Sequence, residues 1–188
     1  MTTNSSNFIA QNKNIFRIAL AVGLILLVPL TASLVSDDMA WTAFDFAFAG
    51  TVLFGTGLAF ELITRKGGNV QYRAAVGIAL LGALMLLWIN LAAGIVGSDD
   101  NAANVLFLAP HAALVIGALV AQLRPAGMAR AMVVTAFVQA LVTVFALVSG
   151  SYPMFEVVKV VLLNGFFITL WAVSAMLFRR AALSQPQV

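Results

Sequence analysis

Two charged side chains interrupt apolar runs of this sequence, and each could form an ion pair or a gate. Asp45 comes four residues after Trp41, and Lys159 comes four residues after Phe155. Each therefore lies about 6 Å along a helix from the end of its run. An isolated charge at that depth in an apolar medium is costly, so we expect Asp45 and Lys159 to form an outer ion pair between two helices. The alternative partner of Lys159 is Glu156, three residues earlier. An interhelical pair would act either as a static contact or as a gate.

Four further polar side chains lie deeper in the apolar runs. Each is eight to ten residues from the end of its apolar run that lies away from the basic residues. This separation corresponds to about 12–15 Å at 1.5 Å per residue. This depth is near the middle of a bilayer, so the sequence predicts a polar midplane site. Its members could line a cavity that binds a solute or conducts protons. Alternatively, they could form interhelical hydrogen bonds worth roughly 0.6–2 kcal/mol each. The four residues are Asn90, His111, Gln139 and Asn164.

His111 is the only histidine of the chain and follows Pro110. A proline inside a helix leaves a backbone carbonyl without its usual donor, and the imidazole N–H could bond to such a carbonyl. The alternative is a proton relay with Asp45, which would respond to pH.

Motifs for catalysis and metal binding are missing from the sequence. It has no HExxH, no GxSxG, no glycine-rich phosphate loop, and no cysteine. The chain is therefore not expected to be an enzyme, and we expect neither a cofactor nor a bound metal.

The composition indicates that these residues are positioned by membrane-spanning helices. The chain has 188 residues, of which 62% are hydrophobic and 9% are charged, whereas a soluble domain has roughly 25% charged residues. Because about 20 apolar residues cross a bilayer as a helix, we expect an all-α, polytopic bundle of six transmembrane helices over 15–180, between tails at 1–14 and 181–188. The predicted spans are 15–35, 41–63, 74–97, 102–123, 128–149 and 155–178.

Charges predict how the helices are threaded. Nine of the ten basic residues fall on one side of the predicted spans, and five acidic residues fall on the other. Basic residues mark the cytoplasmic side, so both termini are expected in the cytoplasm. The basic residues are scattered in ones and twos, which indicates a lipid bilayer as partner and no nucleic acid.

Small residues recur every fourth position in the second predicted span. They let helix backbones approach closely, either inside the bundle or against a second copy or another membrane protein. The stripe is Ala43, Ala47, Thr51, Gly55 and Ala59.

Several segments resemble a group of small bacterial six-span inner-membrane proteins with no known activity. They include WTAFDFAFAG, GTGLAFEL, YRAAVGIALLGA, WINLAAGIVGSDDN and RPAGMARA, and the resemblance covers roughly residues 41–135. It implies a location in the bacterial inner membrane. The residues themselves favour a non-enzymatic component that binds or moves a small solute or ion through the midplane site. The alternative is an accessory subunit that packs against a larger membrane complex.

Overall fold

The computed structural model describes residues 13–36, 41–65 and 68–184, and all regular structure in these ranges is helical. Within these ranges, six helices are long and apolar enough to cross a membrane, counting η1 and α5 together as one. The prediction of an all-α chain with six apolar helices is confirmed, and it indicates a multi-pass membrane protein. The elements are α2 (Lys13–Val35), α3 (Ala43–Arg65), α4 (Val70–Ala92), the 3-10 helix η1 (Ala102–Leu108), α5 (Ala109–Ala121), α6 (Pro125–Ser149) and α7 (Met154–Leu183).

Contacts divide the chain into two compact units, with the boundary after Arg65. The sequence had predicted a single bundle over 15–180. Of the two predicted tails, residues 1–12 and 185–188 lie outside the described residues, as does part of the first acidic loop at 37–40. Helix α2 begins at Lys13 and α7 continues to Leu183, so both helices extend beyond the predicted ends of the spans.

The first unit is the α2–α3 hairpin. Two glycines of α3 allow the helices to approach closely, because a Cβ on Gly57 would lie 2.7 Å from Ile18 and one on Gly50 would lie 3.4 Å from Leu26. Near the chain's start, the Asn14 amide donates to Glu61 at 2.8 Å. No residue of α2 is buried, so this hairpin presents most of its apolar surface outward, as expected for helices surrounded by lipid.

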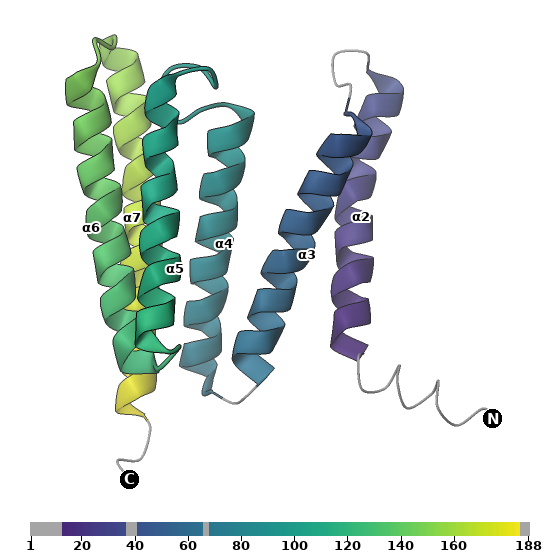
Figure 1. Ribbon diagram of the computed structural model, residues 1–188, viewed down its shortest axis with the longest axis vertical. Helices are drawn as coiled ribbons and strands as arrows, with labels where there is room; N and C mark the ends of the chain where they lie inside the picture. Colours follow the sequence, from purple (N-terminus) through teal and green to yellow (C-terminus); the bar gives the residue numbers. More distant parts are fainter. Residues whose placement is uncertain (1–12, 37–40, 66–67, 185–188) are drawn as a thin grey trace. The chain divides into compact units, whose positions relative to one another are not determined.

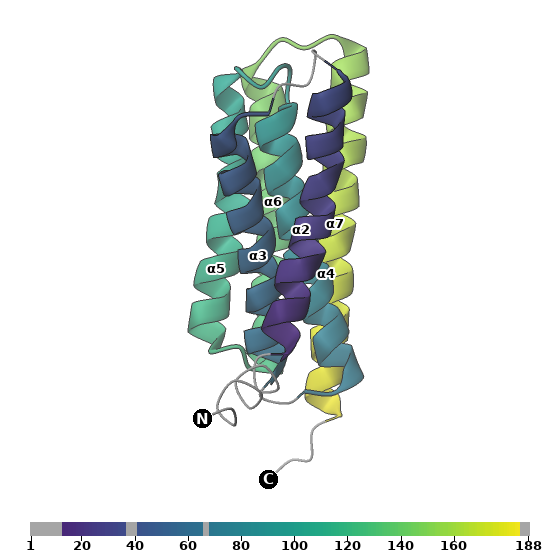
Figure 2. The ribbon, with the colours of Figure 1, turned by 90° about the vertical axis from the view of Figure 1, so that its right-hand side faces the viewer.

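The second unit contains α4, α5, α6 and α7 (Figure 1). Helix α7 packs against both α4 and α6, and α6 packs against α5. The turned view in Figure 2 shows the same four helices running alongside one another. The core of the second unit includes large side chains of α7, since Phe167, Trp171 and Phe178 are almost completely buried.

The acidic residues of this unit lie at one end and its arginines at the other, because neighbouring helices alternate in direction. We call one end the acidic end; it carries Asp99, Asp100 and Glu156, with Lys159 beside Glu156. The other, which we call the basic end, carries Arg73, Arg124, Arg130, Arg179 and Arg180.

Hydrogen bonds join the elements at the basic end. The Asn69 side chain accepts from Tyr72 N and caps α4, and its amide donates to Ala181 O at 3.3 Å. The Tyr72 hydroxyl donates to Leu123 O at 2.8 Å. These contacts connect the start of α4 to α7 and to the turn before α6.

Helix α4 ends at Ala92, five residues before the end of the predicted span 74–97. Gly94 and Gly97 have φ angles of +68° and +69°, a left-handed conformation that glycine adopts at little cost. Ile95 and Val96 are nevertheless fully buried. The apolar residues that extended the predicted span to residue 97 therefore belong to a loop that packs against the acidic end.

Candidate functional site

Gln139 of α6 and Asn164 of α7 form a buried pair in the second unit. Gln139 Nε2 donates to Asn164 Oδ1 at 2.5 Å, and Asn164 Nδ2 donates to Val160 O at 2.8 Å. The exposed fraction of both side chains is 1% or less. Two of the four predicted midplane residues therefore contact each other directly and connect α6 to α7.

His111 connects α5 to α4 through backbone carbonyls. Its Nδ1 lies 3.1 Å from Phe107 O, one turn earlier, and its Nε2 lies 3.0 Å from Ala83 O. A neutral imidazole carries one N–H, so it can donate to one of these oxygens, whereas the protonated ring can donate to both. The expected bond to a backbone carbonyl is present, and it includes a carbonyl of a neighbouring helix. The alternative relay with Asp45 would join the two units and stays a prediction.

Packing between α5 and α6 shows that His111 and Gln139 lie at similar depth. A Cβ on Gly117 would lie 2.7 Å from Ala131 Cβ, so these two residues are at one level. His111 is six residues from Gly117, and Gln139 is eight residues from Ala131, both toward the acidic end. These separations correspond to about 9 Å and 12 Å. His111 therefore belongs near the level of the Gln139–Asn164 pair.

Asn90 lies outside that level. It is seven residues beyond Ala83, whose carbonyl His111 contacts, and this separation corresponds to about 10 Å toward the acidic end. The midplane prediction for Asn90 counted depth from Ser98, but α4 already ends at Ala92. Asn90 is buried, with 7% of its surface exposed, and lies on the same helical face as the core residue Leu86.

Three polar atoms in the interior of the second unit are buried without a hydrogen-bond partner. They are Asn90 Oδ1 on α4, Gln139 Oε1 on α6 and Trp171 Nε1 on α7. The first two are acceptors and the indole N–H is a donor. Buried polar groups in native proteins are nearly always paired, with protein or with ordered water. These three atoms are thus the buried side-chain polar atoms of the described core that lack a hydrogen bond.

The loop between α4 and η1 closes the acidic end through Asn104. Its Oδ1 accepts from Ile95 N at 2.9 Å and from Val96 N at 3.0 Å, and its Nδ2 donates to Ser98 O at 2.7 Å. The two N–H groups are buried together with their side chains and need this acceptor.

Glu156 attaches the same loop to the start of α7. Its Oε1 accepts from Gly97 N at 2.7 Å and lies 2.7 Å from Lys159 Nζ. The local alternative that the sequence offered for Lys159 is therefore the ion pair that the structure contains. The Asp45–Lys159 pair would join the two units, and it stays a prediction.

Asp45 has a role within its own helix. Its Oδ2 accepts from Thr42 N and from Thr42 Oγ1, both at 2.7 Å, and Asp45 N donates to Thr42 Oγ1 at 3.3 Å. This reciprocal arrangement is a capping box at the start of α3, where a negative charge also stabilises the helix dipole. The Asp45 carboxylate thus accepts hydrogen bonds from donors at the start of α3.

Sequence reasoning missed several residues of these networks. The Thr42-x-x-Asp45 spacing is a recognisable capping signature, so Thr42 could have been found. The unpaired Trp171 N–H had no signal, because an indole in an apolar run is usually an apolar core residue. Among the described residues, no group of three or more His, Asp or Glu side chains is arranged to hold a metal ion.

Comparisons with known proteins do not assign this chain to a family. No protein-family model matches the chain, and no curated protein or solved structure shows significant similarity to it.

Proposed function

We propose that this chain is a non-enzymatic integral membrane component that binds or moves a small polar solute or ion through the interior of its second unit. The observation that supports this function is the set of three unpaired polar atoms on Asn90, Gln139 and Trp171. A polar group in a membrane interior has no bulk water to bond to, and each unpaired group costs several kcal/mol. Bound molecules that donate to the carboxamide oxygens of Asn90 and Gln139 and accept from the Trp171 indole, at successive levels along the unit, would remove that cost.

The character of the core favours an uncharged solute. Among the described residues of the second unit, the buried polar side chains apart from Tyr72 at the basic end and Trp171 are asparagine, glutamine, threonine and serine, and none of these carries a charge. A charged ligand buried there would lack a counter-charge, which is costly in a medium of low dielectric constant. We therefore expect a small neutral molecule with hydrogen-bond donors, such as an amide, an alcohol or water.

Membrane placement and threading belong to the same proposal. We place the chain in a bacterial inner membrane, as its resemblance to the small bacterial proteins implies. We place both termini in the cytoplasm, since its arginines gather at one end of the second unit. Because the natural chain has no cysteine, single cysteines can report the threading. Ser184→Cys should be shielded from an impermeant maleimide in intact cells, and Asp99→Cys should be labelled. Labelling of Ser184→Cys alone would reverse the orientation.

A solute screen tests binding directly. Small neutral amides, alcohols and polyols should include one that raises the unfolding temperature of the wild-type protein. The rise should be lost in Gln139→Met, which removes one unpaired oxygen. Thr169→Ala is a matched control, because the exposed Thr169 hydroxyl bonds within its own helix to Gly165 O. An equal rise in all three proteins would place any binding elsewhere and refute the proposed site.

A second candidate function is an accessory subunit of a larger membrane complex, and one observation favours it. The small-residue stripe on α3 does not face α2, which instead approaches Gly50 and Gly57. A Cβ on Gly55 would meet no atom within 4 Å. Gly55→Leu should then release a co-purifying polypeptide, whereas a solute-binding protein would purify without one. The stripe comprises Ala43, Ala47, Thr51 and Gly55, which are exposed, and Ala59, which is half-buried.

A further inference from the structure

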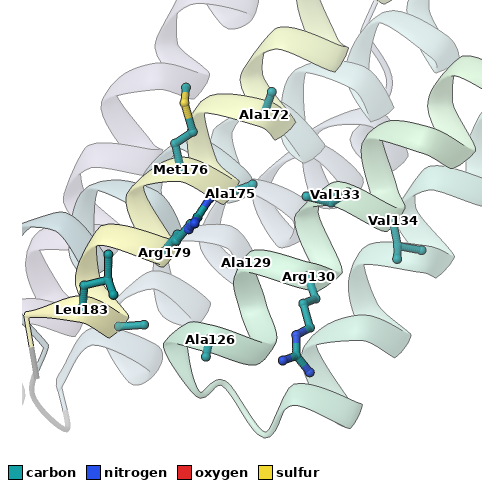
Figure 3. Close-up of a pocket in the computed structure, with 11 residues that line it drawn as sticks. Ala126, Ala129, Arg130, Val133, Val134, Ala172, Ala175, Met176, Arg179 and Leu183 are labelled. Carbon is teal, nitrogen blue, oxygen red and sulfur yellow. The ribbon is translucent and has the colours of Figure 1, made fainter. Parts of the chain in front are cut away.

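A groove of about 740 Å³ runs between α6 and α7 near the basic end of the second unit. Figure 3 shows side chains of the two helices along its sides, with Arg130 on α6 and Arg179 on α7. The groove is separate from the three unpaired polar atoms, since none of their residues lines it.

The walls of the groove are apolar and open to the surroundings. Small side chains such as Ala129 and Ala172 leave the space between the helices, and Ala175 is buried in the wall. Val133 and Met176, on opposite walls, are more than half exposed. Both helices are long and apolar enough to cross a membrane, so this surface would face lipid chains.

The two arginines lie on opposite walls of the groove, toward the basic end. Arg130 is five residues after the start of α6, and Arg179 is four residues before the end of α7. Ala172 lies seven residues beyond Arg179, which gives the apolar part of the groove a length of about 10 Å beyond the guanidinium level.

Neither guanidinium has a carboxylate partner among the described residues, where the ion pair found is Glu156–Lys159. The acidic residues described in the second unit all belong to the opposite end. A pair of cations beside an apolar groove is complementary to a ligand with an anionic head and a hydrocarbon tail. Guanidinium groups bind phosphate oxygens in a two-pronged geometry, and basic pockets between membrane helices recognise anionic lipid head groups.

We propose that this groove binds one anionic phospholipid, with its phosphate on Arg130 and Arg179 and one acyl chain along Ala172 and Val133. The head group lies at the level where membrane-embedded arginines reach the interface. This binding is independent of any solute in the core, because it uses other residues.

Lipid binding can be measured on the full chain by native mass spectrometry. Delipidated protein is titrated with phosphatidylglycerol or with phosphatidylcholine of the same acyl chains. The test variant is Arg130→Gln/Arg179→Gln. The matched control is Arg124→Gln/Arg180→Gln, which removes two charges from the same end without touching the groove. A third variant, Ala172→Leu, fills the groove and keeps every charge.

We expect the wild-type protein and the control to retain one phosphatidylglycerol in preference to phosphatidylcholine. The test variant should bind phosphatidylglycerol at least about tenfold more weakly, as expected for the loss of charge-assisted hydrogen bonds. Ala172→Leu should also retain less of it. An equal loss in the test and control variants would show a diffuse charge effect and overturn the site, as would equal retention of the two lipids by the wild-type protein. In a separate cross-linking experiment with a photoreactive residue at position 176, capture of a second polypeptide would identify the groove as a protein interface and overturn the lipid site.

Discussion

Breaking the Gln139–Asn164 pair should destabilise the protein in the single variants but not in the double variant. Asn164→Leu removes the acceptor of Gln139 Nε2, while Gln139 Oε1 already lacks a partner. The whole Gln139 carboxamide is then buried without a bond, which should lower the free energy of unfolding by about 1–3 kcal/mol.

Gln139→Met should cost less than Asn164→Leu. It leaves Asn164 Oδ1 without its donor, but it also removes the unpaired Oε1 from the core. These two effects oppose each other, so we expect a loss of about 0–2 kcal/mol. The double variant leaves no polar atom of the pair behind and should be close to the wild-type protein in stability.

The coupling energy is obtained from unfolding of the four proteins by sodium dodecyl sulfate in mixed micelles. The expected losses of the two single variants, with a double variant close to the wild type, give a coupling energy of about 1–5 kcal/mol. Its lower part overlaps the range of about 0.6–2 kcal/mol found for hydrogen bonds between membrane helices. If the effects of the single changes simply add, or if Gln139→Met is the more damaging of the two, the pair does not contribute as the geometry requires.

Three further predictions concern other contacts of the fold. Asn104→Ala should destabilise the protein by about 2–4 kcal/mol and speed hydrogen exchange at residues 93–101, because two buried N–H groups lose their acceptor; unchanged exchange there would contradict the proposed capping role. Asp45→Ala should cost about 1 kcal/mol of stability and increase exchange only in the first turn of α3. Gly117→Ala should lower the unfolding temperature, because its Cβ would lie 2.7 Å from a neighbouring Cβ, whereas Gly165→Ala has free space and should not; equal effects would show that the close approach is absent.

The helices were predictable because their signal is spread over many residues. Each apolar run is about 20 residues long, and single polar side chains such as Gln139 do not interrupt it. The end of α4 was not predictable in the same way. Ile95 and Val96 are as apolar as a helix interior, and only the Asn104 side chain, nine and eight residues later, provides the acceptor that lets them form a loop.

Contacts between polar residues were predictable only in part. Depth along a helix placed Gln139 and Asn164 at one level, and the structure has the two side chains in contact, within uninterrupted helices. The same count placed Asn90 too deep, because it depended on an uncertain helix end. Asp45 was interpreted through Lys159 of the other unit, a pairing that stays a prediction, and its hydrogen bonds to Thr42, three residues away, were overlooked.

The most direct test of the proposed solute site is native mass spectrometry of the untagged protein, extracted gently from its own membrane. The account predicts that the wild-type chain carries a small bound molecule in addition to lipid, and that Gln139→Met/Asn164→Leu loses that molecule while staying folded. A wild-type chain without any such mass, or one accompanied by a stoichiometric second polypeptide instead, would contradict the account and favour an accessory subunit.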